Sequence, residues 1–454
     1  MKGIILARVV GRRWQSSLVG TYDVDKTPIT ARLWAIRKAA LEKEAHLLKT
    51  GSNGAEPVLL EKTTAQSRVE IRYNFASEPK LKDLYIDARG DILMGKIFED
   101  LDSLAGTVAF IHCQDDDAHT LPPQLVTASC EAITLERAIS ARDIIMVGQV
   151  CWVGRSSLDV VVEIHEAQPD SALDLASVSA SPVLVAPTPS RVVSSIFTYV
   201  SRSRDTGKAA LVNKLLVGGA THPPSSPSSS SSSTSTSSAP SPELVLWQQR
   251  EALAQSRKNP TPAHSPALPA AAPDPASAAA SASALLSLGR VAHDMPALSP
   301  PHSVLMQATA LENVCICQPQ NTNTSGRVFG GFLMHRAFDL AEACGYMFAG
   351  AVPTLRRVDK ILFKRPVDIG DLIRLKARIV ASTGTDGGGG AGGDGEVVCE
   401  VTVQIVKPAA QTSVVSNTFS FVFGLPAGTP LKRVLPLSQE EAEVLVAAMQ
   451  RLGQ

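Results

Sequence analysis

The chain has 454 residues, of which 44% are hydrophobic, and a length of about 150 residues per domain gives two or three domains. Its 43 basic and 43 acidic residues balance, so no global field favours nucleic acid or a membrane surface as a partner. No apolar stretch reaches roughly 18 residues, and none of the seven cysteines shows C-x-x-C spacing. We therefore expect no membrane span, no metal or other cofactor, and ordinary buried thiols in a reducing compartment.

The N-terminus is basic. Its first 20 residues carry Lys2, Arg8, Arg12 and Arg13 and no acidic residue. This pattern is typical of a mitochondrial transit peptide, which we place over residues 1–25, with cleavage within about the first 20–40 residues. A chloroplast peptide would be richer in Ser and Thr, and an untargeted tail is the alternative. The sequence thus predicts a location in the mitochondrial matrix.

The first half of the chain predicts one long helix among several strands. Residues 34–49 predict an exposed helix, and the alternating segment 68–75 predicts a first strand. A long helix follows over about 95–112. Four further strands are predicted at about 125–135, 143–153, 158–166 and 194–202. We expect an inserted loop over 167–190 and a short cap or helix over 206–216.

The middle of the chain has low complexity. Residues 221–242 are almost all Ser, Pro and Thr and bury too little apolar surface to offset their ordering entropy, so we expect disorder there. The segment 242–258 predicts a helix. Residues 259–296 are rich in Ala, Pro and Ser and predict a linker.

The second half repeats the same order of elements. A strand within 303–320 precedes a long helix over about 331–348. Four strands are then predicted at about 355–365, 371–382, 396–406 and 414–424. The glycine-rich run 387–395 predicts a flexible hairpin insertion. An amphipathic helix over 437–452 closes the chain, with Ser438 as its N-cap.

Two segments match in register at a separation of 236 residues. Gly90 to Ala105 (GDILMGKIFEDLDSLA) aligns with Gly326 to Ala341, so that Gly95 pairs with Gly331. Each segment leads into a long helix and then into alternating strands. The chain therefore predicts a duplicated unit of one long helix followed by antiparallel strands.

The two copies differ at two polar positions. Where the second copy has Asn323, the first has Asp87, and where the first has Asp102, the second has Phe338. Each half thus holds a polar residue that its partner lacks. A site shared across a pseudo-two-fold interface would produce this asymmetry.

The paired motifs KIFEDLDSLAG and GRVFGGFLMHRAFDLA resemble those of the hotdog-fold acyl-coenzyme A thioesterases, and most closely the mitochondrial double-hotdog subgroup of acyl-coenzyme A thioesterase 9 and its relatives. The likeness spans roughly 60–220 and 296–430. It implies an α+β fold of two hotdog units, each an antiparallel sheet wrapped around a long central helix. The implied domains are hotdog units over 60–218 and 296–430, a linker with a short helix over 219–295, and the helix 437–452.

Thioester hydrolysis needs a polarised carbonyl and an activated water. The start of the second helix, at Gly331, could supply backbone donors for the oxyanion. By position, the resemblance makes Asp102 the general base and Asn323 its partner from the other half. The alternatives are that Asp102 is a solvated residue beside Glu99 and Asp100, and that Asn323 is a loop residue.

Other polar residues remain candidates. Asp339 and Glu342 are structural or belong to a vestigial site, and His112 and His335 lack the partner Asp that a hydratase would need. Four basic residues could bind coenzyme A phosphates or simply be solvated: Arg155, Lys360, Lys364 and Arg365.

The sequence favours an acyl-CoA thioesterase that acts as a homo-oligomer. The alternative is a catalytically silent protein that binds acyl-CoA or a partner. Retention of both Asp102 and Asn323 favours the enzyme, because a binder needs neither.

Overall fold

A computed structural model describes residues 27–37, 58–115, 123–166, 190–203, 206–217, 241–258, 275–323, 326–383 and 395–453. The described residues fall into two compact units. The first lies within 1–93, 99–130 and 139–262, and the second lies within 94–98, 131–138 and 263–454. Both units combine helices with antiparallel strands. The predicted transit peptide, the Ser-rich stretch, nearly all of the inserted loop and most of the glycine-rich run lie outside the described residues.

The first unit is built on an antiparallel sheet with the strand order β3-β7-β6-β5-β2. These strands and the short parallel pair of the unit are β1 (Glu61–Thr63), β2 (Val69–Tyr73), β3 (Gln124–Cys130), β5 (Ile144–Val153), β6 (Ser157–Glu166), β7 (Arg191–Arg202) and β8 (Lys214–Leu216). Its helices are α2 (Thr64–Ser67), α3 (Pro79–Asp83), α6 (Pro242–Lys258) and the part of α4 (Met94–Cys113) from Glu99 onward. The two predicted helices at 95–112 and 242–258 and the predicted strands are confirmed, except that the strand predicted at about 125–135 is interrupted after Cys130 and its last part belongs to the second unit.

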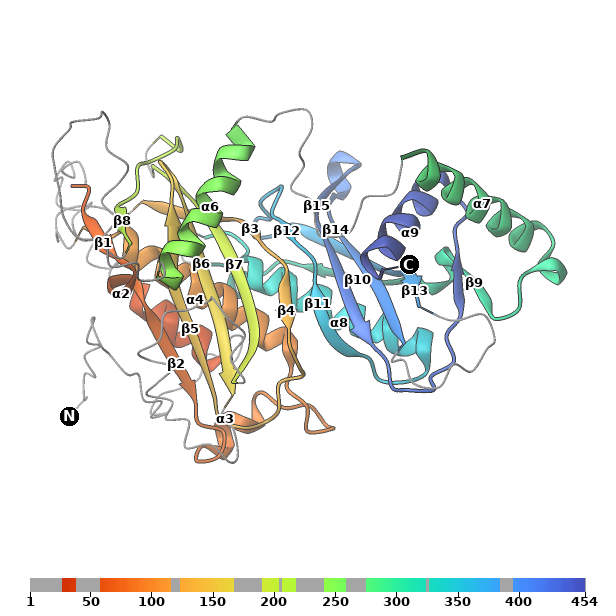
Figure 1. Ribbon diagram of the computed structural model, residues 1–454, viewed down its shortest axis with the longest axis horizontal. Coiled ribbons are helices and arrows are strands. Elements are labelled where there is room, and N and C mark those ends of the chain that lie inside the picture. Colours follow the sequence, from red (N-terminus) through yellow and green to blue (C-terminus); the bar gives the residue numbers. More distant parts are fainter. Residues whose placement is uncertain are drawn as a thin grey trace, which may run out of the picture. The chain divides into compact units, whose positions relative to one another are not determined.

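Helices cover both faces of this sheet. On one face, Leu104 and Val108 of α4 approach Gly148 of β5. On the other, α6 lies across the strands (Figure 1). Its residue Leu246 joins an apolar cluster made up of Ile145, Val147, Cys151 and Val161. For this reason β5 and β6 are buried along almost their whole length instead of alternating between buried and exposed residues.

A buried ion pair also attaches α6 to the sheet. Arg250 Nε donates to Asp159 Oδ2 at 2.7 Å, and both side chains are nearly inaccessible to solvent. Thr198 Oγ1 donates to the other carboxylate oxygen of Asp159 at 2.7 Å. The Asp159 carboxylate therefore has a charged partner and a neutral donor, which a buried charge requires.

The C-terminal end of α4 is capped by two residues distant in sequence. Lys62 Nζ donates to the carbonyl oxygens of Ile111 and Gln114, and Asn213 Nδ2 donates to His112 and Gln114. A cation at this end also complements the helix dipole. The prediction of a cap or helix over 206–216 is wrong in form: the segment holds β8, and Asn213 just before it supplies the cap as a side chain.

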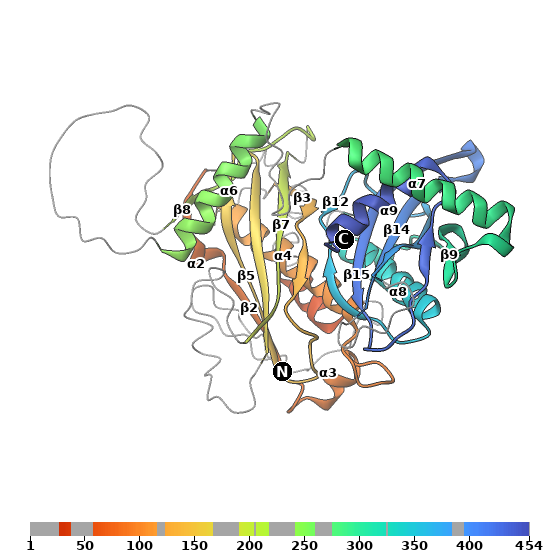
Figure 2. The ribbon, with the colours of Figure 1, turned by 45° about the vertical axis from the view of Figure 1, so that its right-hand side comes forward.

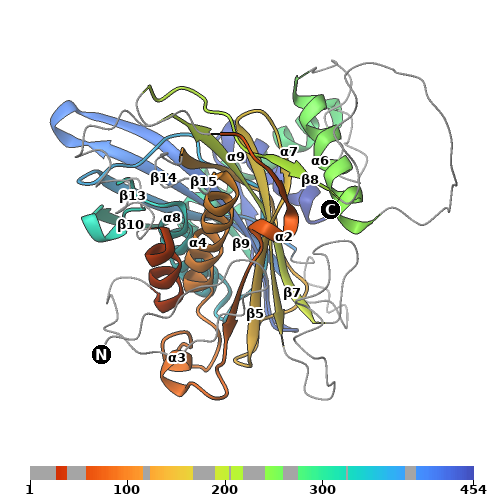
Figure 3. The same ribbon diagram turned by 90° about the vertical axis from the view of Figure 1, so that its left-hand side faces the viewer.

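Residues 28–37 form a helix alongside α4, dark red in Figure 3. The helix predicted over 34–49 is confirmed over its described residues 34–37, which are exposed or partly exposed. It begins earlier than predicted, and the added first part carries the buried Ile29 and Leu33. The remainder of that predicted helix, after Arg37, lies outside the described residues. The N-terminal helix is thus an integral part of the first unit.

The second unit has an antiparallel sheet with the order β10-β13-β14-β15-β11-β4. Its strands, including a short parallel pair, are β4 (Ile133–Leu135), β9 (Ser303–Leu305), β10 (Leu311–Ile316), β11 (Thr354–Val358), β12 (Ile361–Leu362), β13 (Leu372–Ser382), β14 (Glu396–Lys407), β15 (Thr412–Gly424) and β16 (Arg433–Leu435). Its helices are α7 (Pro275–Asp294), α8 (Gly330–Ala349) and α9 (Gln439–Arg451), with four short 3-10 turns. The long helix, the C-terminal helix and the predicted strands are confirmed, except that the strand predicted at about 355–365 is two short strands, β11 and β12.

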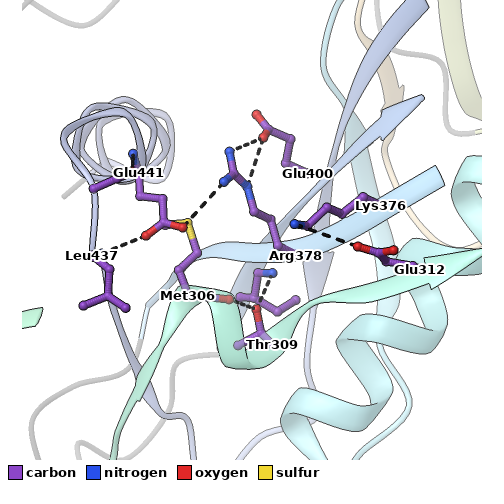
Figure 4. A network of polar contacts seen from close by, with 10 residues as sticks. Met306, Thr309, Glu312, Lys376, Arg378, Glu400, Leu437 and Glu441 are labelled. Carbon is purple, nitrogen blue, oxygen red and sulfur yellow. Dashed lines mark hydrogen bonds and ion pairs between the residues drawn. The ribbon is translucent and has the colours of Figure 1, made fainter. Parts of the chain in front are cut away.

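Helix α8 packs against β13, β14 and β15, while α9 packs on β13 beside α7 (Figure 2). A polar network joins α9 to the sheet (Figure 4). Arg378 donates to Glu400 at 2.9 Å and lies 3.8 Å from Glu441 of α9. Ser438 accepts from the backbone N–H of Glu441 at 3.1 Å, which confirms the predicted N-cap.

The predicted linker over 259–296 is wrong in its second part, where α7 forms. The composition that indicated a linker is also rich in alanine, the best helix former. The helix buries four apolar residues: Ala282, Leu285, Leu286 and Ala292. Tertiary packing therefore decides the outcome.

Within the described ranges, no helix combines the length and the apolar character needed to cross a bilayer. All seven cysteines are free thiols.

Candidate functional site

Asp102 lies on the inward face of α4 and is only 6% exposed. Its carboxylate accepts a hydrogen bond from Tyr199 of β7 at 3.2 Å and another from Thr127 of β3 at 3.3 Å. The alternative of a solvated helix residue is wrong, because the Asp102 side chain is itself buried. The neighbouring Glu99 and Asp100 are buried as well. Asp102 is thus a buried carboxylate held by two hydroxyl donors.

The surroundings of Asp102 keep Tyr199 protonated. Burial and the charge of Asp102 raise the pKa of Tyr199 well above its usual value, so its hydroxyl remains a donor. Arg37 of the N-terminal helix also interacts with both groups. Burial lowers the pKa of Arg37, and the nearby Tyr199 and Asp102 partly offset that shift. Sequence reasoning missed Tyr199, Thr127 and Arg37, because only strand pairing and helix docking bring them to Asp102.

Asp100 is the centre of a second buried polar cluster on α4. It accepts hydrogen bonds from four side chains and one backbone N–H, the side chains being Thr27, Thr30, Tyr73 and Tyr85. Burial raises the pKa of Asp100 to about 6, although these hydrogen bonds act in the opposite direction.

Asn323 lies in a tight turn of the second unit. Its backbone N–H donates to the Arg327 carbonyl at 2.6 Å, and its Oδ1 accepts from the Arg327 N–H at 3.2 Å. Gly326, with φ of +76°, closes the turn by donating to the Asn323 carbonyl. The side-chain oxygen therefore has the structural role that the loop alternative foresees.

The first unit contains the same turn. Asp87 N–H donates to the Asp91 carbonyl, Asp87 Oδ1 accepts from the Asp91 N–H at 2.9 Å, and Gly90 has φ of +90°. An isolated bridge flanks each turn, Ile86 with Ile92 and Thr322 with Val328. Every one of these positions is shifted by the same 236 residues, so Asp87 and Asn323 have equivalent backbone roles.

Gly331 lies in the first turn of α8, directly after Gly330. Phe329 is the N-cap and provides no side-chain cap. The positive end of the α8 dipole is therefore at Gly331, where backbone N–H groups point out of the helix.

Phe338 replaces the carboxylate at the position aligned with Asp102. It is buried, and its ring lies 5.5 Å from Phe98, 5.9 Å from Phe421 and 6.1 Å from Phe423, measured between centroids. This position of the second unit belongs to an aromatic core and offers no base.

His335 and Asp339 form a pair that the sequence analysis did not find. His335 Nε2 lies 3.5 Å from Asp339 Oδ2, one turn apart on α8, and Arg336 also lies 3.6 Å from that carboxylate. Because this Asp is a neighbour on the same helix, the expectation that His335 lacks an Asp at the spacing of a hydratase stays a prediction. A Cβ atom placed on Gly95, the counterpart of Gly331, would lie 2.0 Å from the His335 ring. His335 thus covers the start of α4 within the second unit.

The other candidates have ordinary surroundings. Burial lowers the pKa of His112 to about 4, and its Nε2 lies 3.0 Å from the Asn213 carbonyl oxygen. Lys360 forms an ion pair with Glu131 at 2.8 Å. The remaining basic candidates for phosphate binding are exposed: Arg155, Lys364 and Arg365. Among the residues that the structure describes, no three His, Cys, Asp or Glu side chains are grouped to hold a metal ion.

No family model matches the chain. It is 35% identical over 434 residues to acyl-coenzyme A thioesterase 2, chloroplastic, of Humulus lupulus, covering 93% of this chain and 88% of the relative. Acyl-coenzyme A thioesterase 4, mitochondrial, of the same plant is 34% identical, with 93% and 73% covered. Acyl-coenzyme A thioesterase 9, mitochondrial, of Mus musculus is 26% identical, with 88% and 80% covered.

A similar solved structure is the acyl-CoA hydrolase of Staphylococcus aureus, at 20% identity, with 33% of this chain and 88% of that chain covered and a TM-score of 0.29. A likeness this weak supports no conclusion about the arrangement of the units.

Proposed function

Because the chain belongs to the acyl-coenzyme A thioesterases and is a thioester hydrolase, we propose that Asp102 is its general base and that Asn323 orients the attacking water. The products are a free fatty acid and coenzyme A. The pairing of Asp102 with Asn323 rests on the aligned motifs, and each residue is described in its own unit.

In the proposed reaction, the thioester carbonyl oxygen lies at the start of α8, where backbone N–H groups near Gly331 stabilise the developing negative charge. Asp102 takes a proton from water, and the hydroxide adds to the carbonyl carbon. The carbon–sulfur bond then breaks, and the thiolate of coenzyme A leaves with the proton that Asp102 returns. Removing one oxyanion donor typically costs about 3–4 kcal/mol of transition-state stabilisation.

The observation that carries the proposal is the environment of the Asp102 carboxylate. It is buried, it accepts from Tyr199 and Thr127, and its aligned position in the second unit is a phenylalanine. A buried carboxylate is costly to keep unless it is fully hydrogen-bonded or used. The presence of this carboxylate in the first unit, where the second unit has a phenylalanine, favours a catalytic use of Asp102.

We also propose that each unit is a hotdog domain, over 60–218 and 296–430, and that the chain arose by duplication. The equivalent turns at Asp87 and Asn323 support this, as do the long helices α4 and α8 that follow each turn. A fragment that ends after α6, near residue 262, tests whether the first unit folds alone.

The proposed location is the mitochondrial matrix, which the basic N-terminus and the mitochondrial relatives favour, while a chloroplastic relative is the competing case. We further propose a homo-oligomer. The edge strand β10 exposes Val314 and Ile316, at 55% and 56%, and such an apolar edge favours association. Light scattering on the purified protein decides the oligomeric state.

Release of free thiol from acyl-CoAs of graded chain length tests the function directly. We expect turnover of at least one acyl-CoA, with a kcat that exceeds the rate constant of uncatalysed hydrolysis by many orders of magnitude. A protein that binds acyl-CoA tightly without releasing thiol is instead the non-catalytic alternative.

A further inference from the structure

The N-terminal helix is fastened to α4 along its length. Thr27 and Thr30 donate to the carboxylate of Asp100, and the backbone N–H of Thr30 does so at 3.1 Å. Asp100 is therefore an anion at the N-terminus of this helix, where the dipole favours negative charge. One turn later, Trp34 Nε1 donates to Ser103 Oγ at 3.2 Å.

Arg37 ends the described part of this helix and lies on α4 one turn beyond Asp102. Its Nε donates to Thr107 Oγ1 at 3.0 Å, and its Nη2 donates to the carbonyl of Ser103. The guanidinium lies over Gly106, where an added Cβ would be 3.0 Å from both Nη1 and Nη2. The absence of a side chain at Gly106 leaves room for this close approach.

We propose that Arg37 is a positioning residue for hydrolysis: its charge, held on α4 one turn beyond Asp102, keeps the Asp102 carboxylate ionised, so that the docked N-terminal helix completes the site. This inference rests on the proposed role of Asp102 as general base. In this proposal Arg37 does not contact the substrate.

The charges around Asp102 support the assignment. Arg37, from the N-terminal helix, is a cation on which the charge of Asp102 acts, and Tyr199, from β7, is neutral. Thr127, from β3, has no charge to offer. On α4 itself, the neighbouring Glu99 and Asp100 are acidic and buried. A nearby cation favours the charged form of such a carboxyl group.

The test is the pH dependence of kcat/KM in the full-length protein. Arg37→Gln removes the charge, so the acidic limb of the profile should move to higher pH by about one unit or more, with activity recovering at alkaline pH. Arg37→Lys keeps the charge and should restore most of the shift. Trp34→Phe, which loosens the same helix without changing a charge, is the matched control and should leave the midpoint in place.

A folded Arg37→Gln variant with an unchanged midpoint overturns the proposal. If that variant fails to fold, Arg37→Met decides in the same way, because methionine keeps a long unbranched side chain on α4 without the charge. The two proposals fail separately. Normal hydrolysis by Asp102→Asn removes the proposed base, whereas loss of hydrolysis in Asp102→Asn with no shift in Arg37→Gln removes only the role of Arg37.

Discussion

The phenolic hydroxyl of Tyr199 lies 3.2 Å from the Oδ1 of Asp102, and it also donates to the main-chain oxygen of the same residue at 3.1 Å. The two residues are 97 positions apart in the chain. Because Tyr199 stays protonated, it fixes one lone pair of the carboxylate and leaves the orientation of Asp102 little freedom.

Replacing the proposed base tests the site directly. Asp102→Asn keeps the shape and the acceptor oxygen but removes the base, so the single-turnover rate of thioester hydrolysis should fall by about 10²-fold or more while acyl-CoA binding is largely retained. Asp339→Asn is the control, and it should keep most of the activity because Asp339 is half exposed and paired on its own helix. The reverse result would assign the working site to the other half.

The proposed partner of the base should be coupled to it. Asn323→Ala should slow hydrolysis to a similar extent, if Asn323 orients the water that Asp102 deprotonates. Residues that act as one unit are strongly non-additive, so the double variant should be little slower than either single variant. Because the Asn323 oxygen also accepts from the backbone of Arg327, Asn323→Asp is the better control for loss of the turn. Fully additive rate losses would mean that the two residues act independently.

Asp100 should give the folding stability a pH dependence. Its pKa is raised to about 6 in the folded protein, against about 3.9 in an unfolded chain. The protonated carboxyl therefore favours the folded state below about pH 4, and this contribution is lost as the pH rises through 6. It amounts to about 3 kcal/mol at most.

Comparison with Asp100→Asn isolates this ionisation. The difference in unfolding free energy between the wild type and the variant should change from pH 4 to pH 7. The stability of the wild type should fall relative to that of the variant as the pH rises. His112, whose depressed pKa acts in the opposite direction, is present in both proteins and cancels. The hydrogen bonds to Asp100 that the variant loses change its unfolding free energy by an amount that does not depend on pH. Parallel stability curves would contradict the raised pKa.

The docking of α6 should depend on its buried ion pair. Arg250→Met leaves the Asp159 carboxylate buried without its cation and should destabilise the first unit by about 3–5 kcal/mol, measured by denaturant unfolding. Adding Asp159→Leu should recover much of that loss, since an apolar pair needs no desolvated charge. A loss below about 1 kcal/mol for the single variant would show that α6 contributes little to the unit.

The mature N-terminus should lie before Thr27. The contacts of Thr27, Trp34 and Arg37 with α4 would be lost if cleavage occurred later within the predicted range of about 20–40 residues. N-terminal sequencing of the protein from its source should therefore begin upstream of Thr27 and downstream of Met1. A mature chain that starts after Arg37, and is fully active, would count against both this placement and the role of Arg37.

Much of the fold follows from the sequence because its signals are local. The long apolar periods of α4 and α8 and the alternating strands are each visible within a window of about 20 residues, and comparing two such windows gives the 236-residue repeat. The Ser438 cap follows from a single residue type before Glu441. The aligned motifs also single out Asp102 and Asn323.

Only the tertiary structure decides which of these surfaces is buried. The alanine-rich stretch that predicts a linker becomes α7 because neighbouring elements cover its apolar side, and β5 and β6 lose their alternation because α6 lies over the outer face. The sequence predicts that Arg37 is part of an exposed helix, whereas in the structure its guanidinium lies at Gly106, one turn beyond Asp102 on α4. Burial and charge pairing depend on contacts between distant segments, which no local pattern contains, whereas helix and strand periods depend only on neighbours along the chain.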